Sequence, residues 1–313
     1  MENNGSKGVI LITGGSGLIG RRLTGMLRES GYEVRILSRK KVLVPGARIF
    51  NWDYPAGKIS EQALEGVDHI IHLAGASIAD GRWTGERKRE IIESRTLGAR
   101  FLFNELSARG IRLKSFTSAS ATGYYGAITS DKIFQEDEPP GVDFAAVTCI
   151  KWESEAVNFK RIADRVVIIR TGIVLSPSGG MLGAIIPTVR MGISPLPGTG
   201  KQWVPWIDID DLTSIYLKAV GDTSMKGIYN AVSPEPVTYS TLVGSLASNS
   251  GRRVLKPTTP GFILKFILGE RSAIFLTGSR VSPAKIINEG FSFRYPSLES
   301  SLRNLLPGES GAK

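Results

Sequence analysis

Short apolar runs alternate with longer amphipathic stretches along most of the chain. The runs are rich in β-branched residues, which is typical of strands that lie inside a parallel sheet with both faces covered. The longer stretches repeat apolar residues three and four positions apart, a spacing that predicts helices with one buried face. The predicted strands are 9–12, 32–38, 48–52, 68–73, 113–118 and 165–170, and the predicted helices are 18–30, 85–108, 144–163, 212–219, 240–248 and 260–268.

This alternation predicts an α/β fold with a doubly wound parallel Rossmann sheet. Residues 1–175 and 205–232 form the predicted sheet domain. Residues 176–204, which are rich in proline and glycine, leave the sheet and join residues 233–313 in a smaller mixed C-terminal lobe. Because ligands commonly bind where two domains meet, we expect a substrate cleft between the sheet and this lobe.

A glycine-rich turn, in the sequence GVILITGGSGLIG, joins the first predicted strand to the first predicted helix. In such a turn Gly14 permits a sharp bend, Gly17 lets backbone N–H groups approach a diphosphate, and Gly20 lets the helix pack close to the sheet. Phosphate then lies at the positive end of the helix. The context of strand, turn and helix predicts a dinucleotide-binding site rather than an ordinary turn. The predicted contacts are Gly14, Ser16, Gly17, Leu18, Ile19 and Gly20.

The end of the predicted strand 32–38 bears on the choice of cofactor. Sites that prefer NAD(H) usually place Asp or Glu there, to accept hydrogen bonds from the adenosine ribose. This chain has Ser38 and Arg39 instead. A guanidinium pairs with a 2′-phosphate, which a carboxylate would repel, so the pattern favours NADP(H) over NAD(H). Asp53, at the end of the next predicted strand, is expected to meet the adenine.

The predicted strand 68–73 runs into small residues. Leu73, Ala74 and Gly75 are expected to let the sugar and phosphate of the cofactor lie against backbone. Glu90 and Arg95, on the long helix that follows, are candidates for bracing the ribose on the nicotinamide side. Pairing of these two side chains on the protein surface is the alternative.

Composition and charge limit the classes of function. The 313 residues are 42% hydrophobic and 22% charged, which is typical of a globular protein. No apolar run approaches the roughly 18–20 residues of a membrane span, so no membrane partner is expected. Cys149 is the only cysteine, which excludes an intrachain disulfide framework and favours a cytoplasmic location. The net charge of +10 is spread over short basic groups without a nucleic-acid-binding module, so solubility or capture of a small polyanion explains it better than nucleic acid.

Metal binding is not predicted. Asp208, Asp210 and Asp211 precede a predicted helix, where helix capping and pairing with the helix dipole explain them without a cation. His69 and His72 lie within a predicted buried strand, and we expect structural roles for them. With two histidines and one cysteine, the chain has few ligands for zinc.

The order of several motifs resembles a known family. TGGSGLIG, HLAG, FTSASATGYYG, RTGIVLS and GTGKQWVPWIDIDDL, followed by GFSFRYPSLESSL, resemble extended short-chain dehydrogenase/reductases of the NAD-dependent epimerase/dehydratase superfamily. Within it, the chain is similar to atypical sugar-nucleotide epimerase-like proteins with a small C-terminal domain, some of which are labelled cell-division inhibitors. The resemblance spans nearly the whole chain. It implies a Rossmann domain, a substrate lobe, and a position beside the nicotinamide for Ile173.

The resemblance also implies catalytic residues that this chain lacks. In the superfamily, a Ser or Thr works with a Tyr and a Lys that lie four residues apart on a helix. Ser120 can supply the hydroxyl, but the helix 144–163 has Cys149 and Glu153 at the expected spacing. Glu153 would raise the pKa of Cys149 rather than lower it. Tyr124 and Tyr125, in the loop after the predicted strand 113–118, are the alternative proton donors.

Two interpretations of function follow. The first is an NADP(H)-dependent oxidoreductase or epimerase that acts on a carbonyl or sugar-like small molecule through a non-standard proton donor. The second is a non-enzymatic NADP(H)-sensing regulator, in which cofactor occupancy changes a surface for a protein partner. In either case a homodimer is considered as the assembly.

Overall fold

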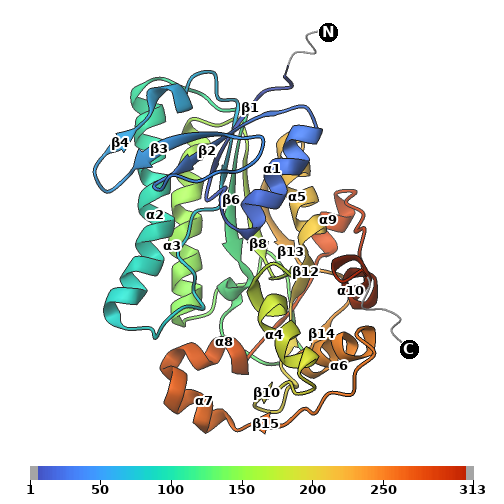
Figure 1. Cartoon of the computed structure of the whole chain (residues 1–313). Coiled ribbons are helices and arrows are strands. Elements are labelled where there is room, and N and C mark those ends of the chain that lie inside the picture. Colours follow the sequence, from blue (N-terminus) through green and yellow to red (C-terminus); the bar gives the residue numbers. More distant parts are fainter. Residues whose placement is uncertain (1–5, 308–313) are drawn as a thin grey trace.

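The computed structural model describes residues 6–307 and shows an eight-stranded Rossmann sheet with a smaller lobe at one end (Figure 1). The strand order is β13-β8-β6-β5-β1-β2-β3-β4. All neighbouring strands are parallel except β3 and β4, which are antiparallel. The predicted α/β fold is therefore confirmed. The strands are β1 (Val9–Thr13), β2 (Glu33–Ser38), β3 (Arg48–Asp53), β4 (Lys58–Ile59), β5 (His69–His72), β6 (Ser115–Ala121), β8 (Val166–Thr171) and β13 (Gly227–Ala231).

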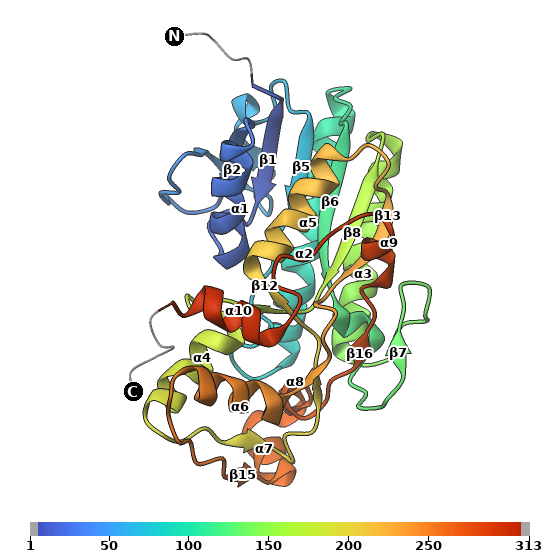
Figure 2. The same cartoon turned by 90° about the vertical axis from the view of Figure 1, so that its right-hand side faces the viewer.

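Helices cover both faces of this sheet. α1 (Leu18–Glu29) and α5 (Ile209–Gly221) lie side by side on one face, and α2 (Gly85–Ala108) and α3 (Phe144–Asn158) lie on the other (Figure 2). Buried aliphatic residues fill the space between each pair of helices and the sheet. α2 begins at the predicted residue, because the Thr84 side chain accepts a hydrogen bond from the Arg87 nitrogen and so caps the helix. Short 3-10 turns are Glu61–Ala63, Thr122–Tyr125, Phe159–Arg161 and Gly269–Ser272.

The smaller lobe has a core of its own. Leu182, Trp206, Leu242 and Leu302 are buried together there, so segments far apart in sequence make one hydrophobic cluster. Its helices are α4 (Gly180–Arg190), α6 (Tyr239–Asn249), α7 (Gly261–Leu268), α8 (Ala273–Leu276) and α10 (Leu298–Leu305), and its strand pairs are β10 (Leu196–Pro197) with β15 (Thr258–Thr259) and β11 (Trp203–Val204) with β14 (Val237–Thr238).

The chain between the lobe helices also returns to the sheet. β16 (Arg280–Val281) pairs with β7 (Ile133–Phe134), and α9 (Ala284–Asn288) packs near β13. Ile286 is buried in the core of the sheet rather than in that of the lobe. The assignment of residues 233–313 to one lobe stays a prediction, since this stretch contacts both bodies. Two further strands, β9 (Ile173–Leu175) and β12 (Trp206–Asp208), pair where the chain leaves and re-enters the sheet domain.

Several predicted boundaries differ from the structure. The strand predicted at 113–118 is β6, which continues to Ala121 because the hydroxyl-rich residues pair with β8. The helix predicted to reach 163 ends at Asn158 and tightens into a 3-10 turn. α4 was not predicted, because glycine and proline dominate its surroundings in the sequence.

The acidic residues at the start of α5 have structural roles, and that of Asp208 is the predicted helix cap. The Asp208 side chain accepts a hydrogen bond from the Asp210 nitrogen at 2.8 Å and caps α5, which therefore starts earlier than expected. The Asp211 carboxylate accepts from the backbone nitrogens of Arg294 and Tyr295. Within residues 6–307 no group of three His, Cys, Asp or Glu side chains is arranged to hold a metal ion.

Candidate active site

The glycine-rich turn between β1 and α1 has the shape of a phosphate site. Gly14 has a φ of +70°, and a Cβ on it would lie 2.8 Å from the Ala74 nitrogen, so only glycine fits. Gly17 is the N-cap of α1, and no described side chain caps this helix. The first turn of α1 also has no acidic residue, so its N–H groups and positive end are oriented for an external anion. The diphosphate of a dinucleotide fits this turn.

Gly20 has a role different from the predicted one. A Cβ on Gly20 would lie 2.5 Å from the Gly15 Cα and 2.7 Å from the Gly14 oxygen. The close approach that Gly20 permits is therefore between the helix and the glycine turn, and not between the helix and the sheet. Ser16, Leu18 and Ile19 belong to the same turn and first helical residues, and their contact with a cofactor stays a prediction.

The end of β5 lies against the glycine turn. The Leu73 nitrogen donates to the Thr13 oxygen, and the Ala74 nitrogen donates to Thr13 Oγ1. His72 Nδ1 lies 2.8 Å from the same Oγ1, and its Nε2 lies 3.1 Å from the Arg95 oxygen. Burial lowers the pKa of His72 to about 4, so the imidazole is neutral and joins these elements. The structural role predicted for His72 is confirmed. His69 is also buried, within hydrogen-bond distance of Ser115 Oγ.

The two α2 residues proposed near the nicotinamide ribose have different surroundings. The Arg95 guanidinium carbon lies 5.0 Å from the centre of the Trp152 ring and 3.0 Å from a Cβ built on Gly75. Arg95 therefore lies against the loop that follows β5, in keeping with a place near the cofactor. Glu90 is exposed and pairs with Arg87, one turn earlier on the same helix. The surface-pairing alternative describes Glu90 in this structure.

The residues expected at the adenosine end follow strands next to β1. β2 lies beside β1, so Ser38 and Arg39 come at the same edge of the sheet as the glycine turn. Ser38 Oγ donates to the Lys40 oxygen, which orders this corner. The exposed Arg39 guanidinium lies 5.6 Å from the centre of the Tyr54 ring. Asp53 accepts a hydrogen bond from the Ala56 nitrogen in the turn after β3, and its contact with adenine stays a prediction.

A buried ion pair occupies the other side of the site. Parallel pairing of β6 with β8 places Ser120 beside Arg170. Arg170 is 1% exposed, and its Nε and Nη2 donate to the two carboxylate oxygens of Glu153 at 2.9 and 3.0 Å. Ser120 Oγ donates to Glu153 Oε1 at 2.7 Å. Arg170 thus balances the charge of the buried Glu153 from the strand β8.

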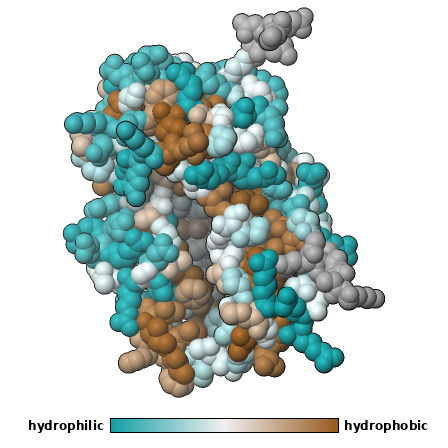
Figure 3. All heavy atoms as spheres, in the orientation of Figure 1, coloured by the Kyte–Doolittle hydropathy of each residue, from teal (hydrophilic) through white to brown (hydrophobic). Residues whose placement is uncertain are grey.

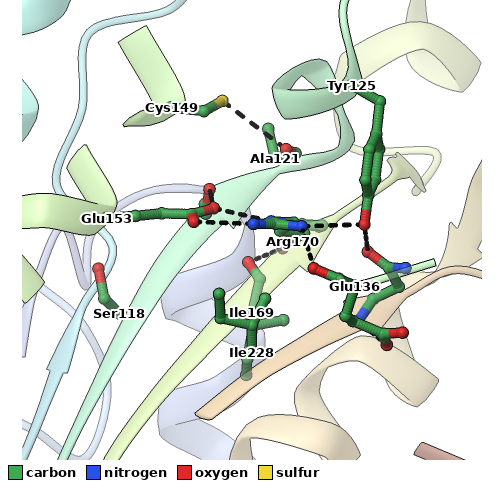
Figure 4. Close-up of polar contacts among 12 residues, drawn as sticks. Ser118, Ala121, Tyr125, Glu136, Cys149, Glu153, Ile169, Arg170 and Ile228 are labelled. Atoms are coloured by element: carbon green, nitrogen blue, oxygen red, sulfur yellow. Dashed lines mark hydrogen bonds and ion pairs between the residues drawn. The ribbon is translucent and has the colours of Figure 1, made fainter. Parts of the chain in front are cut away.

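The remaining edge of Arg170 holds Tyr125 and the loop after it (Figure 4). Arg170 Nη1 donates to the Tyr125 hydroxyl at 3.1 Å and to the Glu136 oxygen at 3.0 Å. The Tyr125 hydroxyl in turn donates to Asn230 Oδ1 at 2.7 Å. Burial raises the pKa of Tyr125 to about 12 although Arg170 opposes this shift. Tyr125 is therefore a buried, hydrogen-bonded phenol at neutral pH, which argues against it as the proton donor.

Cys149 is not an activated nucleophile. Its thiol is buried and lies 3.7 Å from the Ala121 oxygen. Burial and, second, the charge of Glu153 raise the pKa of the thiol to about 11. The predicted direction of the Glu153 effect is confirmed, and desolvation is the larger cause. Cys149 therefore remains a neutral thiol at physiological pH.

Tyr124 differs from its neighbour Tyr125. Its ring is half-buried and stacks on Arg170, with the guanidinium carbon 3.4 Å from the ring centre. None of the hydrogen bonds within residues 6–307 uses the Tyr124 hydroxyl, whereas that of Tyr125 makes two. Ile173, two residues beyond β8, is half-buried, and its place beside a nicotinamide stays a prediction.

Sequence reasoning missed the residues that organise this cluster. The apolar pattern places Arg170 in a buried strand without predicting a role for it, and it does not single out Glu136 or Asn230. One sign was present, because an arginine directly after four aliphatic residues of a buried strand requires a partner. The identity of that partner depends on how the strand meets α3 and the loop before it.

A Rossmann sheet whose first turn is shaped for a diphosphate defines a dinucleotide-binding protein. Comparison with known proteins agrees, because residues 10–231 match the NAD dependent epimerase/dehydratase family. The chain belongs to this family, which confirms the resemblance seen in its motifs. Residues 259–305 match a domain of unknown function, DUF1731.

Relatives align over nearly the whole chain. The chain is 34% identical to an Arabidopsis thaliana protein named "Epimerase family protein SDR39U1 homolog, chloroplastic", over 96% of this chain and 87% of that protein. The crystal structure of human epimerase family protein SDR39U1 with NADPH is 29% identical and superposes with a TM-score of 0.83, over 95% of this chain and 98% of the human one. A nucleoside-diphosphate sugar epimerase from Corynebacterium glutamicum is 33% identical, with a TM-score of 0.75, over 96% of this chain and 58% of its own.

Proposed function

We propose that this protein binds NADP(H) and uses it in oxidoreduction or epimerisation of a carbonyl or sugar-like small molecule. The observation that carries this proposal is the pairing of an uncapped helix start with Arg39 at the end of the neighbouring strand β2. The start of α1 can hold the diphosphate, and Arg39 can hold a 2′-phosphate. The NADPH in the crystal structure of the human relative supports the choice of NADP(H). NAD(H) is the alternative cofactor.

The proton donor in this proposal is Tyr124. Its half-buried ring and uncommitted hydroxyl suit proton transfer, whereas the Tyr125 hydroxyl is held by Arg170 and Asn230. The Arg170 guanidinium stacked on Tyr124 would stabilise negative charge as the proton leaves. Glu153 holds Arg170 in place, and the Ser120 hydroxyl donates to Glu153. In this arrangement neither Glu153 nor Ser120 is free to take part in proton transfer as the superfamily's catalytic residues do. The nicotinamide supplies hydride chemistry when it is bound.

A non-enzymatic NADP(H)-sensing regulator is the alternative function. The observation that favours it is that Cys149 and Glu153, at the spacing expected for the usual Tyr and Lys, are both buried and in contact with other groups of the fold. In such a protein the Arg170 cluster would couple the sheet to the loops around it without performing chemistry. A protein partner would then respond to cofactor occupancy.

One assay distinguishes these two functions. Purified protein is titrated with NADPH and NADH, and oxidation of the tighter-binding form is followed with a panel of carbonyl compounds and nucleotide sugars. We expect tighter binding of NADPH and turnover that Tyr124→Phe abolishes, while Tyr32→Phe, at the other end of the sheet, has no effect. Cofactor binding without turnover of any panel member would favour the regulator, and tighter NADH binding would contradict the cofactor proposal.

The cellular location and the partners belong to the same proposal. We propose a cytoplasmic protein with a small-molecule substrate and no nucleic-acid partner, on the basis of composition and the scattered basic groups. Within residues 6–307 no helix is long and apolar enough to cross a membrane. A homodimer is the proposed assembly to be tested by sedimentation.

A further inference from the structure

Helix α7 presents an apolar surface that the rest of the described chain leaves uncovered. No residue of α7 is buried, although six of its eight residues are large and apolar. Phe262 and Phe266, one turn apart on the helix, are 73% and 85% exposed, and Ile263 and Ile267 beside them are also exposed. We name these four residues the α7 patch. Figure 3 shows apolar side chains gathered at the lower left of the molecule, where Figure 1 places α7.

This helix is held firmly in place. The Arg82 guanidinium donates to the backbone oxygens of Ile267 and Phe266, and Lys88 pairs with Glu270 just after α7. Arg271 donates to the oxygens of Ala79 and Gly81 in the loop before α2. Because these contacts fix the backbone of α7, the exposure of its phenyl rings is built into the fold. Large contiguous apolar patches on a soluble domain mark interaction sites.

Positive charge lies on and beside α7. Between residues 260 and 276 the chain has two basic residues, Lys265 and Arg271, and a single acidic one, Glu270, which already pairs with Lys88. Lys265 lies exposed on α7 itself, and the exposed Arg82 lies against the helix, where it donates only to backbone oxygens. Neither of these two cations forms an ion pair with any described residue. The surface thus combines exposed phenyl rings with free cationic heads.

The chemistry of this surface fits one class of occupant best. Phenyl rings and aliphatic side chains insert at the boundary between lipid headgroups and acyl chains, while lysines beside them meet anionic headgroups. A second copy of this chain fits poorly, because a symmetric contact would bring Lys265 of each copy close together. We propose that the α7 patch docks the protein reversibly on an anionic phospholipid surface. The sequence-based expectation of no membrane partner rested on the lack of a spanning segment and did not consider a folded surface.

The first test measures binding of the full chain to vesicles. Co-sedimentation is compared between vesicles of phosphatidylcholine alone and vesicles of phosphatidylcholine and phosphatidylglycerol in equal amounts. We expect binding to the anionic vesicles only, weakened at high salt because screening shortens the reach of the cationic side chains. The double variant Phe262→Ser/Phe266→Ser should bind at least about tenfold more weakly, since it removes the inserted rings. The matched control Leu43→Ser/Val142→Ser removes two residues that are 80% and 95% exposed elsewhere, and should bind like the unchanged protein.

The second test separates charge from insertion. Lys265→Gln should reduce both the affinity for anionic vesicles and its dependence on salt, while Lys58→Gln, which removes a lysine exposed elsewhere, should change neither. Unchanged thermal unfolding of every variant confirms that the fold is intact.

Four results would overturn the proposal. One is no binding to anionic vesicles, and another is binding that the phenylalanine variant leaves unaltered, which would reflect net charge alone. A self-association that the phenylalanine variant abolishes would assign the patch to a second copy. Binding to polyglutamate but not to vesicles would point instead to an acidic protein partner. None of these measurements depends on catalytic turnover, so failure here leaves the proposed enzymatic function untouched.

Discussion

The two sides of the candidate site differ in how they relate to the family. On the cofactor side, the glycine turn, the end of β5 and the start of α1 have the residues and backbone geometry of a dinucleotide site. On the other side, α3 has Cys149 and Glu153 at the spacing where the motifs led us to expect Tyr and Lys, and Arg170 from β8 neutralises the glutamate. The first side is conventional, while the second has been rebuilt around a buried ion pair.

This difference shows how a Rossmann protein can keep its cofactor site while its chemistry changes. Phosphate binding depends on backbone N–H groups and on glycines, so it requires few particular side chains. Proton transfer depends on one side chain at one place, and a single substitution removes it. In this chain α3 carries the buried carboxylate of Glu153 four residues after Cys149, and Arg170 from β8 balances its charge.

The largest effect is expected from breaking the Glu153–Arg170 pair. Glu153→Gln leaves a buried guanidinium without its counter-charge, and we expect a loss of about 3–5 kcal/mol in the free energy of unfolding. The double variant Glu153→Gln/Arg170→Met should recover part of this loss, because neither charge is then buried alone. Urea unfolding measures both. The exposed pair Arg303–Glu299 is the control, and Glu299→Gln should cost less than about 1 kcal/mol. Equal losses at the two sites would show that the buried pair does not organise the proton-donor side.

The next largest effect is expected at the glycine turn. Gly14→Ala forces a Cβ against the Ala74 nitrogen in a backbone conformation that alanine disfavours, at a cost of about 1–3 kcal/mol. We expect NADPH affinity to fall at least tenfold, since the turn must shift. Gly25→Ala, in the middle of α1 where nothing lies within 4 Å of the new Cβ, should leave affinity unchanged and raise stability by up to about 1 kcal/mol. Isothermal titration and thermal unfolding measure the two quantities. Unaltered affinity of Gly14→Ala would remove the turn from the site.

A smaller effect is expected from Arg39. Arg39→Ala should weaken NADPH binding by about tenfold, the value of one charge-assisted hydrogen bond, and leave NADH binding unchanged. Arg112→Ala, which removes an exposed arginine at the opposite edge of the sheet, should affect neither cofactor. Fluorescence titration with both cofactors tests this. Equal weakening of NADPH and NADH would mean that Arg39 does not read the 2′-phosphate.

The smallest effect is a change in the pH dependence of stability. The pKa of His72 is lowered to about 4 in the folded protein, so the unfolded chain binds a proton between pH 6.5 and 4 that the folded protein does not. Stability from this group is complete above pH 6.5 and falls as the pH drops towards 4. His72→Asn, which can keep a contact with Thr13, should reduce this acid-induced loss of stability. The variant should take up as much as about one proton fewer on unfolding. Urea unfolding at pH 7 and pH 5 measures it, and parallel losses in both proteins would contradict the buried neutral imidazole.

Much of the fold could be predicted from the sequence. The apolar runs predicted six strands of the central sheet, and Thr84 predicted the start of α2. The boundaries of β6 and α3 were less accurate, because hydroxyl residues pair well in a strand when a neighbour covers them, and because α3 tightens at its end. The helix α4 escaped prediction because its composition resembles that of a loop.

By itself, the sequence determined the cofactor side of this protein. A glycine such as Gly14 acts through its own backbone, and a turn between a strand and a helix is local in the sequence. The residues next to such a turn are therefore sufficient to predict it. Only the tertiary structure decided the proton-donor side. The register between β6 and β8 brings Arg170 to Ser120, and the packing of α3 brings Glu153 to both. Burial then sets the pKa of Cys149 and Tyr125, because the loss of water around each group depends on the whole fold.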